Sequence, residues 1–215
     1  TAKSAMHLAG RKYSGQTEIL EKFLAHDKQK AEMLFIANNF RVLLLTRHCA
    51  LKDIHLTKDL VKSKIKTIDK FLKNNLDISC PKLALCALNP HAGEDGILGN
   101  EEIKILKPAV NELIKDGINI TEPLPADTLF TKGAKEYLEN LAQTYDCYIA
   151  NYHDQGLIPI KTVAGIKTVN TTIGLDVIRT SPGHGTAFDI AGQNLADEAG
   201  MISAINTLNK LILKK

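Results

Sequence analysis

Apolar residues follow two spacings along the chain, and each spacing predicts one kind of element. Short apolar runs predict strands at residues 31–38, 40–46, 83–88, 118–121, 147–151, 168–173 and 177–180. Apolar positions three and four residues apart predict helices at residues 17–25, 57–76, 100–117, 135–144 and 197–213. The helix at 57–76 is the clearest, with Thr57 as a candidate N-cap residue. Its apolar stripe consists of Val61, Ile65, Ile68 and Leu72.

The order of these elements predicts a mixed sheet covered by helices. The first two strands are separated by the short polar turn Asn38-Asn39 and therefore predict a hairpin. Strands and helices alternate after it, which is the pattern of an α/β fold. Pro108 is expected to bend the helix at 100–117. We find no internal repeat or long linker, and composition marks no internal domain boundary.

Composition excludes several classes of protein. With 215 residues, 44% of them hydrophobic, the chain is long enough for a substantial core. The net charge is only +3, and the lysines of the 57–76 helix predict a solvated face rather than a nucleic-acid surface. Aromatic residues make up 5% and Trp is missing, so we expect no base-stacking platform.

Cysteine usage and hydropathy indicate the compartment. The four cysteines form no CxxC pair, which is typical of a reduced, cytoplasmic protein. There is no signal-peptide pattern and no apolar run of about 18 residues, so we expect no membrane span.

The stretch with the densest chemistry, residues 152–161, follows the strand at 147–151. It combines an imidazole, a carboxylate, a glycine and an ammonium group: His153, Asp154, Gly156 and Lys161. In open α/β sheets, ligands bind beyond the carboxyl ends of the strands. We therefore expect a functional site where this strand ends.

Three histidines, His48, His91 and His153, each follow a predicted strand. Imidazole is the commonest nitrogen ligand of transition metals, and three protein ligands are typical of a catalytic metal site. Their spacing matches no local motif such as HExxH, and each alone could be an ordinary polar residue. Their shared placement favours a divalent-metal site. His7, His26 and His55 lack such company and are expected at the surface.

A second set, Lys161, Asn170 and Arg179, suits an anionic substrate that bears phosphate or carboxylate. The alternative is ordinary surface charge. Asp127 and Asp154 could orient metal-binding imidazoles or transfer protons. The segment before the helix at 17–25 could bind an anion through exposed N–H groups, or simply cap the helix.

Four motifs in order resemble the 4-hydroxythreonine-4-phosphate dehydrogenase family of pyridoxal phosphate biosynthesis. They are NPHAGE at 89–94, PLPADTLF at 123–130, YHDQGL at 152–157, and RTS at 179–181 with HGTA at 184–187. The resemblance covers essentially the whole chain. Residues 184–192 also resemble the wider isocitrate and isopropylmalate dehydrogenase superfamily, in which this loop borders the nucleotide cofactor.

The resemblance implies a mixed-sheet, isocitrate/isopropylmalate dehydrogenase-like α/β fold. It also implies NAD-dependent oxidation of 4-phosphooxy-L-threonine, followed by decarboxylation to 3-amino-2-oxopropyl phosphate. A divalent metal would be held by His48, His91 and His153, drawn from both subunits of a homodimer with a shared active site. Zn, Mg, Co, Mn and Ni all remain open, because such a site accepts several ions. NADP also stays open, since no GxGxxG fingerprint is present.

The resemblance further assigns individual residues. It places substrate contacts on Gln16, Thr17, Lys161, Asn170 and Arg179. It places His184, Gly185 and Thr186 close to the cofactor.

Two departures from the family pattern keep alternatives open. Gln16 stands where the family usually has His, and an amide cannot become a cation. A sister dehydrogenase for 4-phosphothreonate or 4-phosphoerythronate is therefore the second interpretation. The chain also begins Thr-Ala-Lys, well inside the family pattern. We expect residues 1–215 to be the C-terminal portion of such an enzyme, and an inactive dimerising fragment is the third interpretation.

Overall fold

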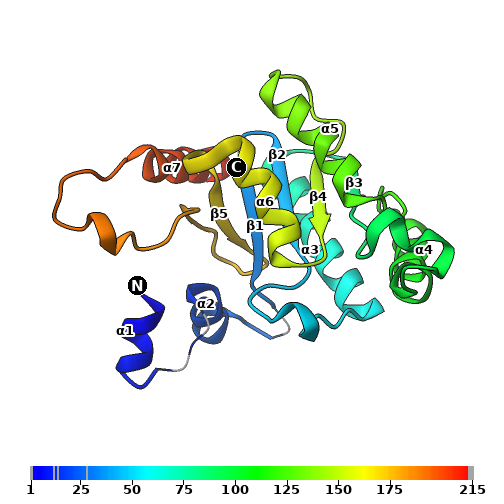
Figure 1. Cartoon of the computed structure of the whole chain (residues 1–215), viewed down its shortest axis with the longest axis horizontal. Coiled ribbons are helices and arrows are strands. Elements are labelled where there is room, and N and C mark those ends of the chain that lie inside the picture. The colour runs from blue at the N-terminus through cyan, green and yellow to red at the C-terminus, as the bar shows by residue number, and fades with distance from the viewer. Residues whose placement is uncertain (1, 12, 14, 28, 213–215) are drawn as a thin grey trace.

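A six-stranded mixed sheet forms the centre of the computed structural model, which describes residues 2–11, 13, 15–27 and 29–212 (Figure 1). The strand order is β3-β4-β2-β1-β5-β6. The strands are β1 (Glu32–Ala37), β2 (Phe40–Leu44), β3 (Leu83–Leu85), β4 (Cys147–Ala150), β5 (Val169–Ile173) and β6 (Arg179–Pro182). The predicted hairpin is confirmed, because β1 pairs antiparallel with β2. The predicted mixed α/β architecture is confirmed as well.

Seven α-helices of the described residues surround this sheet. They are α1 (Lys3–Leu8), α2 (Gln16–Leu24), α3 (Lys58–Leu76), α4 (Lys107–Lys115), α5 (Ala126–Leu138), α6 (His153–Ala164) and α7 (Ala199–Ile212). Figure 1 shows α6 lying across the front of the sheet, with α1 and α2 below it. Across the described ranges, no helix combines the length and the apolar character that a membrane span requires.

Both faces of the sheet are covered, so its central strands are apolar on both sides. On one face, Leu43 and Ile149 are neighbours in the register and pack against α3 and α4. On the other face, Val42 and Tyr148 are neighbours and pack with α5 and α6. The predicted stripe of α3 is confirmed, since its four residues are completely buried.

The strand directions bring several chain segments to one edge of the sheet. Strands β2, β3 and β4 are parallel, so their carboxyl ends meet at this edge. Strand β1 is antiparallel to both β2 and β5, and β6 is antiparallel to β5. The first residues of β1 and β6 therefore lie at the same edge. We call it the ligand edge.

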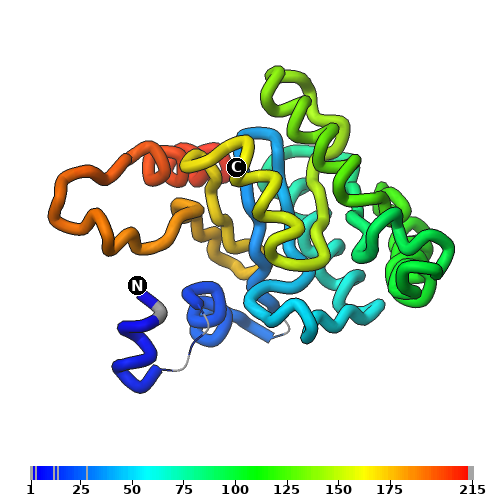
Figure 2. The backbone as a smooth tube through the Cα atoms, in the orientation of Figure 1, coloured from blue at the N-terminus to red at the C-terminus, as the bar shows by residue number. Residues whose placement is uncertain are grey.

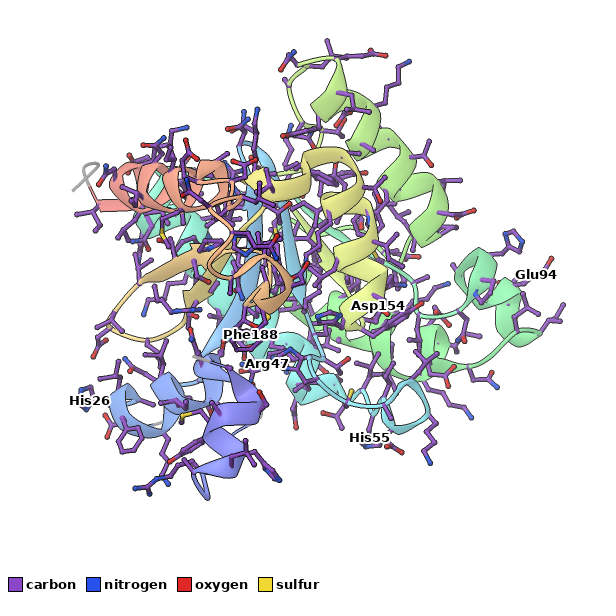
Figure 3. All side chains as sticks on the ribbon, turned by 60° about the vertical axis from the view of Figure 1, so that its left-hand side comes forward. His26, Arg47, His55, Glu94, Asp154 and Phe188 are labelled. Atoms are coloured by element: carbon purple, nitrogen blue, oxygen red, sulfur yellow. The ribbon has the colours of Figure 1, made fainter. Side chains whose placement is uncertain are left out.

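Most local predictions hold at this level. Thr57 caps α3, because its Oγ1 accepts a hydrogen bond from the Leu60 N–H at 3.2 Å. His7, His26 and His55 are exposed, as expected, and Figure 3 shows His26 and His55 at the periphery. The predicted final helix is α7, whose expected last residue, Leu213, lies outside the described residues.

Several boundaries were predicted wrongly, and α6 was not predicted at all. Residues 153–164 form a helix although they contain Gly156 and Pro159, both poor helix formers. Gly156 is required by packing, because a Cβ there would lie 2.7 Å from Leu44 and 2.8 Å from Val42. Glycine thus allows α6 to approach the sheet closely.

Other corrections concern the segments beside prolines and the ends of the sheet. The helix expected at 135–144 is α5, which begins at Ala126, directly after Pro125. The expected strand at 118–121 is only an isolated bridge between Leu83 and Ile120. The strand expected at 177–180 lies two residues later, as β6.

The helix predicted at 100–117 is divided in two. A π-helical segment, Glu102–Leu106, precedes α4, and Pro108 lies in the first turn of α4. A π turn holds more residues than an α turn and shifts the apolar stripe around the helix. Ile103 and Ile114 are therefore about half exposed, at 46% and 49%, although the simple 3.6-residue period predicts them in the core.

Candidate active site

His48 and His153 are brought together at the ligand edge. His48 follows β2, and His153 is the first residue of α6 after β4. Their ring centroids are 5.6 Å apart, with an angle of 41° between the ring planes. The Nδ1 atom of His153 lies 2.7 Å from an Asp154 carboxylate oxygen. This contact can hold the Nδ1 proton and leave Nε2 as the electron-pair donor toward a cation.

His91 sits on an unusual backbone. It lies in the turn Pro90–Gly96, where five consecutive residues, His91 to Asp95, have φ between 44° and 79°. Left-handed conformations cost non-glycine residues on the order of 1 kcal/mol each, and they concentrate at functional sites. The residues that the structure describes contain no group of three His, Cys, Asp or Glu side chains placed to hold a metal. One chain therefore juxtaposes only two of the three predicted ligands, and the three-histidine site stays a prediction.

Glu102 holds this left-handed turn in place. Its side chain is buried, and Oε1 accepts hydrogen bonds from the N–H groups of Leu88 and Asn89, both at 2.8 Å. Its Oε2 accepts from Asn89 Nδ2 at 2.9 Å. A Cβ on Gly93 would lie 2.8 Å from the same Oε2, so the turn packs directly on the carboxylate. In the sequence, Glu102 is simply one of the first residues of the helix predicted at 100–117, and no local pattern indicates this role.

The neighbouring carboxylate, Glu101, shares the Asn89 side chain. Its Oε2 accepts from Asn89 Nδ2 at 2.7 Å. This hydrogen bond is the main cause that lowers the pKa of Glu101 below its usual value. The lowered pKa favours the ionised form of Glu101 beside the turn that carries His91.

Gln16 and Arg179 form the second pair at the ligand edge. Arg179 opens β6, and its Nη2 donates a hydrogen bond to the Gln16 Oε1 at the start of α2. Burial lowers the pKa of Arg179, although a guanidinium remains charged at neutral pH. Gly15, the N-cap residue, offers no side-chain hydrogen bond to the first turn of α2. Cationic and N–H donors thus meet here, as an anion site requires. Thr17 is only 2% exposed, so its side chain lies beneath this surface.

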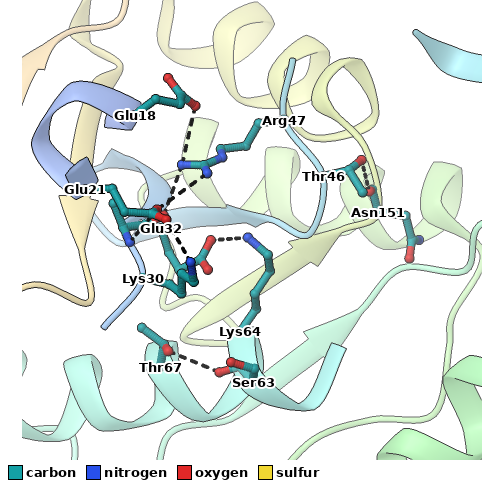
Figure 4. Close-up of polar contacts among 11 residues, drawn as sticks. Glu18, Glu21, Lys30, Glu32, Thr46, Arg47, Ser63, Lys64, Thr67 and Asn151 are labelled. Carbon is teal, nitrogen blue, oxygen red and sulfur yellow. Dashed lines mark hydrogen bonds and ion pairs between the residues drawn. The ribbon is translucent and has the colours of Figure 1, made fainter. Parts of the chain in front are cut away.

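Arg47 ties α2 to the strand that leads to His48 (Figure 4). Its guanidinium lies 3.7 Å from a Glu18 carboxylate oxygen and 3.9 Å from one of Glu21. It also donates to the Ala31 carbonyl at 3.0 Å. The histidine end and the anion end of the ligand edge are therefore connected through one side chain. No pattern in the sequence indicates this role of Arg47.

Asn170, another substrate candidate, lies on the same face of the sheet as Arg179. Asn170 pairs with Ser181 and Thr172 pairs with Arg179, so these side chains share one face of β5 and β6. The Asn170 Oδ1 atom is buried without a hydrogen-bond partner in the described part of the chain. A buried polar atom of this kind is usually satisfied, and a ligand is one way to satisfy it.

Lys161 opens into a separate pocket beside the long segment between β6 and α7. The pocket has a volume of about 890 Å³, and its lining includes Lys161, Gly183, His184 and Thr186. Figure 2 shows the backbone of this segment as an orange loop that extends from the sheet. His184 is exposed, and its Nδ1 lies 2.9 Å from the Gly185 carbonyl oxygen. The size and the mixed lining suit part of a nucleotide.

Asp127 is the candidate that the structure leaves apart. It is exposed in the first turn of α5, where its carbonyl accepts a hydrogen bond from Thr131 Oγ1 at 2.8 Å. Among the hydrogen bonds of the described residues, none joins its carboxylate to a histidine. Its predicted role in proton transfer stays a prediction.

Comparison with known proteins shows which family the chain matches. The family model described as pyridoxal phosphate biosynthetic protein PdxA matches residues 1–208. The chain is 43% identical to a 4-hydroxythreonine-4-phosphate dehydrogenase of Bradyrhizobium diazoefficiens, a match that covers 100% of the chain and 61% of the relative. It is 44% identical to an enzyme of the same name from a Sulfurihydrogenibium strain, covering 92% of the chain and 58% of the relative. The chain thus spans about three fifths of the length of these relatives.

Solved structures agree with the fold. The chain matches a 4-hydroxythreonine-4-phosphate dehydrogenase of Klebsiella pneumoniae with a TM-score of 0.80 and 36% identity, over 97% of this chain and 60% of that one. It matches a terephthalate 1,2-cis-dihydrodiol dehydrogenase of Burkholderia xenovorans with a TM-score of 0.71 and 30% identity, over 97% of this chain and 64% of that one. The predicted fold class and the predicted family resemblance are confirmed.

Proposed function

The chain belongs to the family of the pyridoxal phosphate biosynthetic protein PdxA, and on that premise we propose that its protein is a 4-hydroxythreonine-4-phosphate dehydrogenase. The reaction oxidises the secondary alcohol of 4-phosphooxy-L-threonine with NAD and releases carbon dioxide, leaving 3-amino-2-oxopropyl phosphate. The observation that carries this proposal is the ligand edge, where two adjacent imidazoles and an Arg179–Gln16 anion site lie on connected elements.

The donor set fits a divalent metal. His48 and His153 present neighbouring rings, and Asp154 orients one of them. When bound, the metal would polarise the substrate oxygens and the dinucleotide would accept the hydride. Because the described residues of one chain gather only two of the histidines, we propose that a homodimer completes the set with His91.

The chain's own side chains would bind and orient the substrate. Arg179, Gln16 and the N–H groups at the start of α2 would hold the phosphate, with Thr17 beneath them. Asn170 would satisfy its buried Oδ1 on a donor group of the substrate. Lys161 would face both the substrate and the cofactor pocket, where His184, Gly185 and Thr186 would border the dinucleotide.

A second candidate rests on Gln16. The amide pairs with Arg179 without adding charge, whereas an imidazole could add a positive charge beside a phosphate. A solved structure 30% identical to this chain is named for a different substrate, a cis-dihydrodiol, so the fold is not restricted to one alcohol. A sister dehydrogenase for 4-phosphothreonate or 4-phosphoerythronate is therefore the alternative, and an inactive dimerising portion is a third.

The test is elemental analysis of the purified protein before and after chelation, together with a substrate panel. NADH or NADPH formation would be followed on the three phosphorylated substrates. Bound metal with turnover of 4-phosphooxy-L-threonine supports the proposal. Bound metal with turnover only of a phosphorylated hydroxy acid would establish the sister enzyme. A protein that binds no metal and turns over nothing would support the inactive portion.

A further inference from the structure

Two residues, Asn151 and Gln155, connect the three strand ends that lead to the histidines, through their side-chain amides and the backbone carbonyl of Asn151. We call this pair the amide bracket. Gln155 Nε2 donates to the Ala87 carbonyl at 2.8 Å, beyond the end of β3. Gln155 Oε1 accepts from the Asn151 N–H at 2.7 Å and from Asn151 Nδ2 at 3.2 Å.

Asn151 connects the other two ends. Its Nδ2 donates to the Cys86 carbonyl at 2.8 Å. Its own carbonyl accepts from Thr46 Oγ1 at 2.7 Å and from the Thr46 N–H at 3.1 Å (Figure 4). Asn151 is completely buried, so these bonds form away from water, where a lost partner is costly.

The bracket begins where the regular sheet stops. The last residue pair between β3 and β4 is Leu85 with Ile149, followed by one bond from the Cys86 N–H to the Ile149 carbonyl. Beyond this bond, the described residues form no further backbone hydrogen bond between these two strand ends. Side-chain amides then hold the end of β3 beside the end of β4, whereas between β2 and β4 the backbone ladder continues through the bond from the Thr46 N–H to the Asn151 carbonyl.

Sequence distance places each bonded group close to a predicted ligand. Thr46 precedes His48 by two residues, Ala87 precedes His91 by four, and Gln155 follows His153 by two in the first turn of α6. Asn151 also precedes His153 by two residues. A shift of any one end would move the corresponding imidazole, and metal affinity depends on the placement of its ligands.

We propose that Gln155, acting with Asn151, is the positioning residue of the three-histidine metal site. The inference rests on the proposed function, because it presupposes that these histidines bind a cation. Gln155 touches neither the metal nor the substrate. It fixes the start of α6 relative to the end of β3 in each subunit, whichever subunit each histidine serves.

Glutamine is the side chain that this position requires. One end of the amide must accept from the Asn151 N–H while the other donates to the Ala87 carbonyl. Gln155→Met keeps the length of the side chain and loses all three of its hydrogen bonds. Gln155→Glu keeps the acceptor, loses the donor and sets a carboxylate oxygen against the Ala87 carbonyl.

The chain offers a matched control in Gln143, at the opposite edge of the sheet. Its Nε2 donates to the Gly133 carbonyl at 3.2 Å, and its Oε1 accepts from the Tyr148 hydroxyl at 3.0 Å. Gln143→Met therefore removes the same two kinds of bond far from the histidines. This control variant therefore measures how much thermal stability is lost when an amide side chain loses its hydrogen bonds at a place away from the metal site.

The experiment measures Co²⁺ binding to the purified, metal-free protein by calorimetry, and the ligand-field absorption of the Co²⁺ complex. Thermal unfolding of the metal-free variants is measured in parallel. We expect both Gln155 variants to weaken Co²⁺ binding by roughly tenfold to a hundredfold and to change the absorption spectrum. Gln143→Met should keep the parental affinity and spectrum while losing comparable thermal stability.

The outcomes separate this inference from the function on which it rests. If the parent binds Co²⁺ and both Gln155 variants bind it with the parental affinity and spectrum, Gln155 is a purely structural residue and the inference is wrong. If the parent binds no Co²⁺, the metal site itself is wrong and the inference falls with it. Should Gln155→Met not fold, Gln155→Glu, which keeps the bond to Asn151, decides the question by the same two readouts.

Discussion

At the scale of single residues, buried polar side chains determine the shape of the ligand edge. Glu102 is buried without a cationic partner among the described ion pairs, and three N–H donors compensate its charge. These donors belong to Leu88 and Asn89, directly before the left-handed turn of His91. The strained backbone is therefore stabilised by a carboxylate rather than by its own residue types.

Glu102→Gln should destabilise the protein by about 1–3 kcal/mol, because an NH₂ group would face an N–H donor in a buried place. The free energy of unfolding can be measured in urea. Glu101→Gln is the control, since Glu101 is more exposed and shares only the Asn89 side chain. Equal stability of the Glu102 variant and the parent would contradict the role of this carboxylate.

At the scale of elements, ion pairs join helices to the sheet and to one another. Arg47 holds α2 against the end of β2, and Lys64 of α3 forms a buried ion pair with Glu32 of β1. Burial lowers the pKa of Lys64 despite this carboxylate. Lys58 and Lys62 of α3 both contact Glu112 of α4.

Arg47→Met should raise the KM for the phosphorylated substrate and lower stability by roughly 1 kcal/mol, because α2 loses its ionic contacts with the sheet. Steady-state kinetics and urea unfolding measure the two effects. Lys30→Met is the matched control, since Lys30 also contacts Glu21 but its side chain is 68% exposed. An unchanged KM in Arg47→Met would show that α2 is positioned without this residue.

The ion pairs of Glu112 with Lys58 and Lys62 predict how the stability of the protein depends on pH. Hydrogen bonds from Lys58 and then Lys62 lower the Glu112 pKa from 4.5 to about 2. A carboxyl group whose pKa is lower in the folded than in the unfolded protein stabilises the folded state. This contribution is fully present above the unfolded-state pKa and is lost as the pH falls through the folded-state pKa. The stability difference between the parent and Glu112→Gln should therefore be constant above about pH 5 and decline toward pH 2. Urea unfolding across this range checks it, and a pH-independent difference would contradict the assigned pKa.

Elements also show what a sequence pattern can and cannot predict. Strand ends could be located, because an apolar run that stops at Thr46 or Asn151 is a local signal. Helix α6 could not be located, because Gly156 and Pro159 lower the helix propensity of its sequence. The helix forms nevertheless, because Gly156 lets it pack closely against Val42 and Leu44. The amide bracket could not be predicted either, because its bonds to the end of β3 join residues that are 65 and 68 positions apart.

At the scale of the whole molecule, the strand order explains why the site is only partly assembled in one chain. The order β3-β4-β2 places the end that leads to His153 between those that lead to His91 and His48. His48 and His153 become neighbours, whereas His91, on its left-handed turn, does not join them as a third ligand among the described residues. Exposed apolar residues close to this turn, Ile97 at 78% and Leu98 at 42%, are consistent with coverage by a second copy.

If the two subunits of a dimer share each active site, pairs of inactive variants should restore activity when they form mixed dimers. We would co-express His48→Ala, His91→Ala and His153→Ala in the three possible pairs and measure turnover of 4-phosphooxy-L-threonine. Each single variant should be inactive. In a mixed dimer, one site is intact when the two substituted histidines normally come from different subunits, so random pairing should restore about a quarter of the parental activity.

The pattern among the three pairs is more informative than the activity of any one. If two subunits share each site, two pairs should regain activity, and the third should not, because its two histidines come from the same subunit. That silent pair would therefore identify which two ligands one chain contributes. If no pair regains activity while each mixed dimer is shown to form, every site draws its ligands from one chain, and His91 must then move toward His48 and His153 when the metal binds.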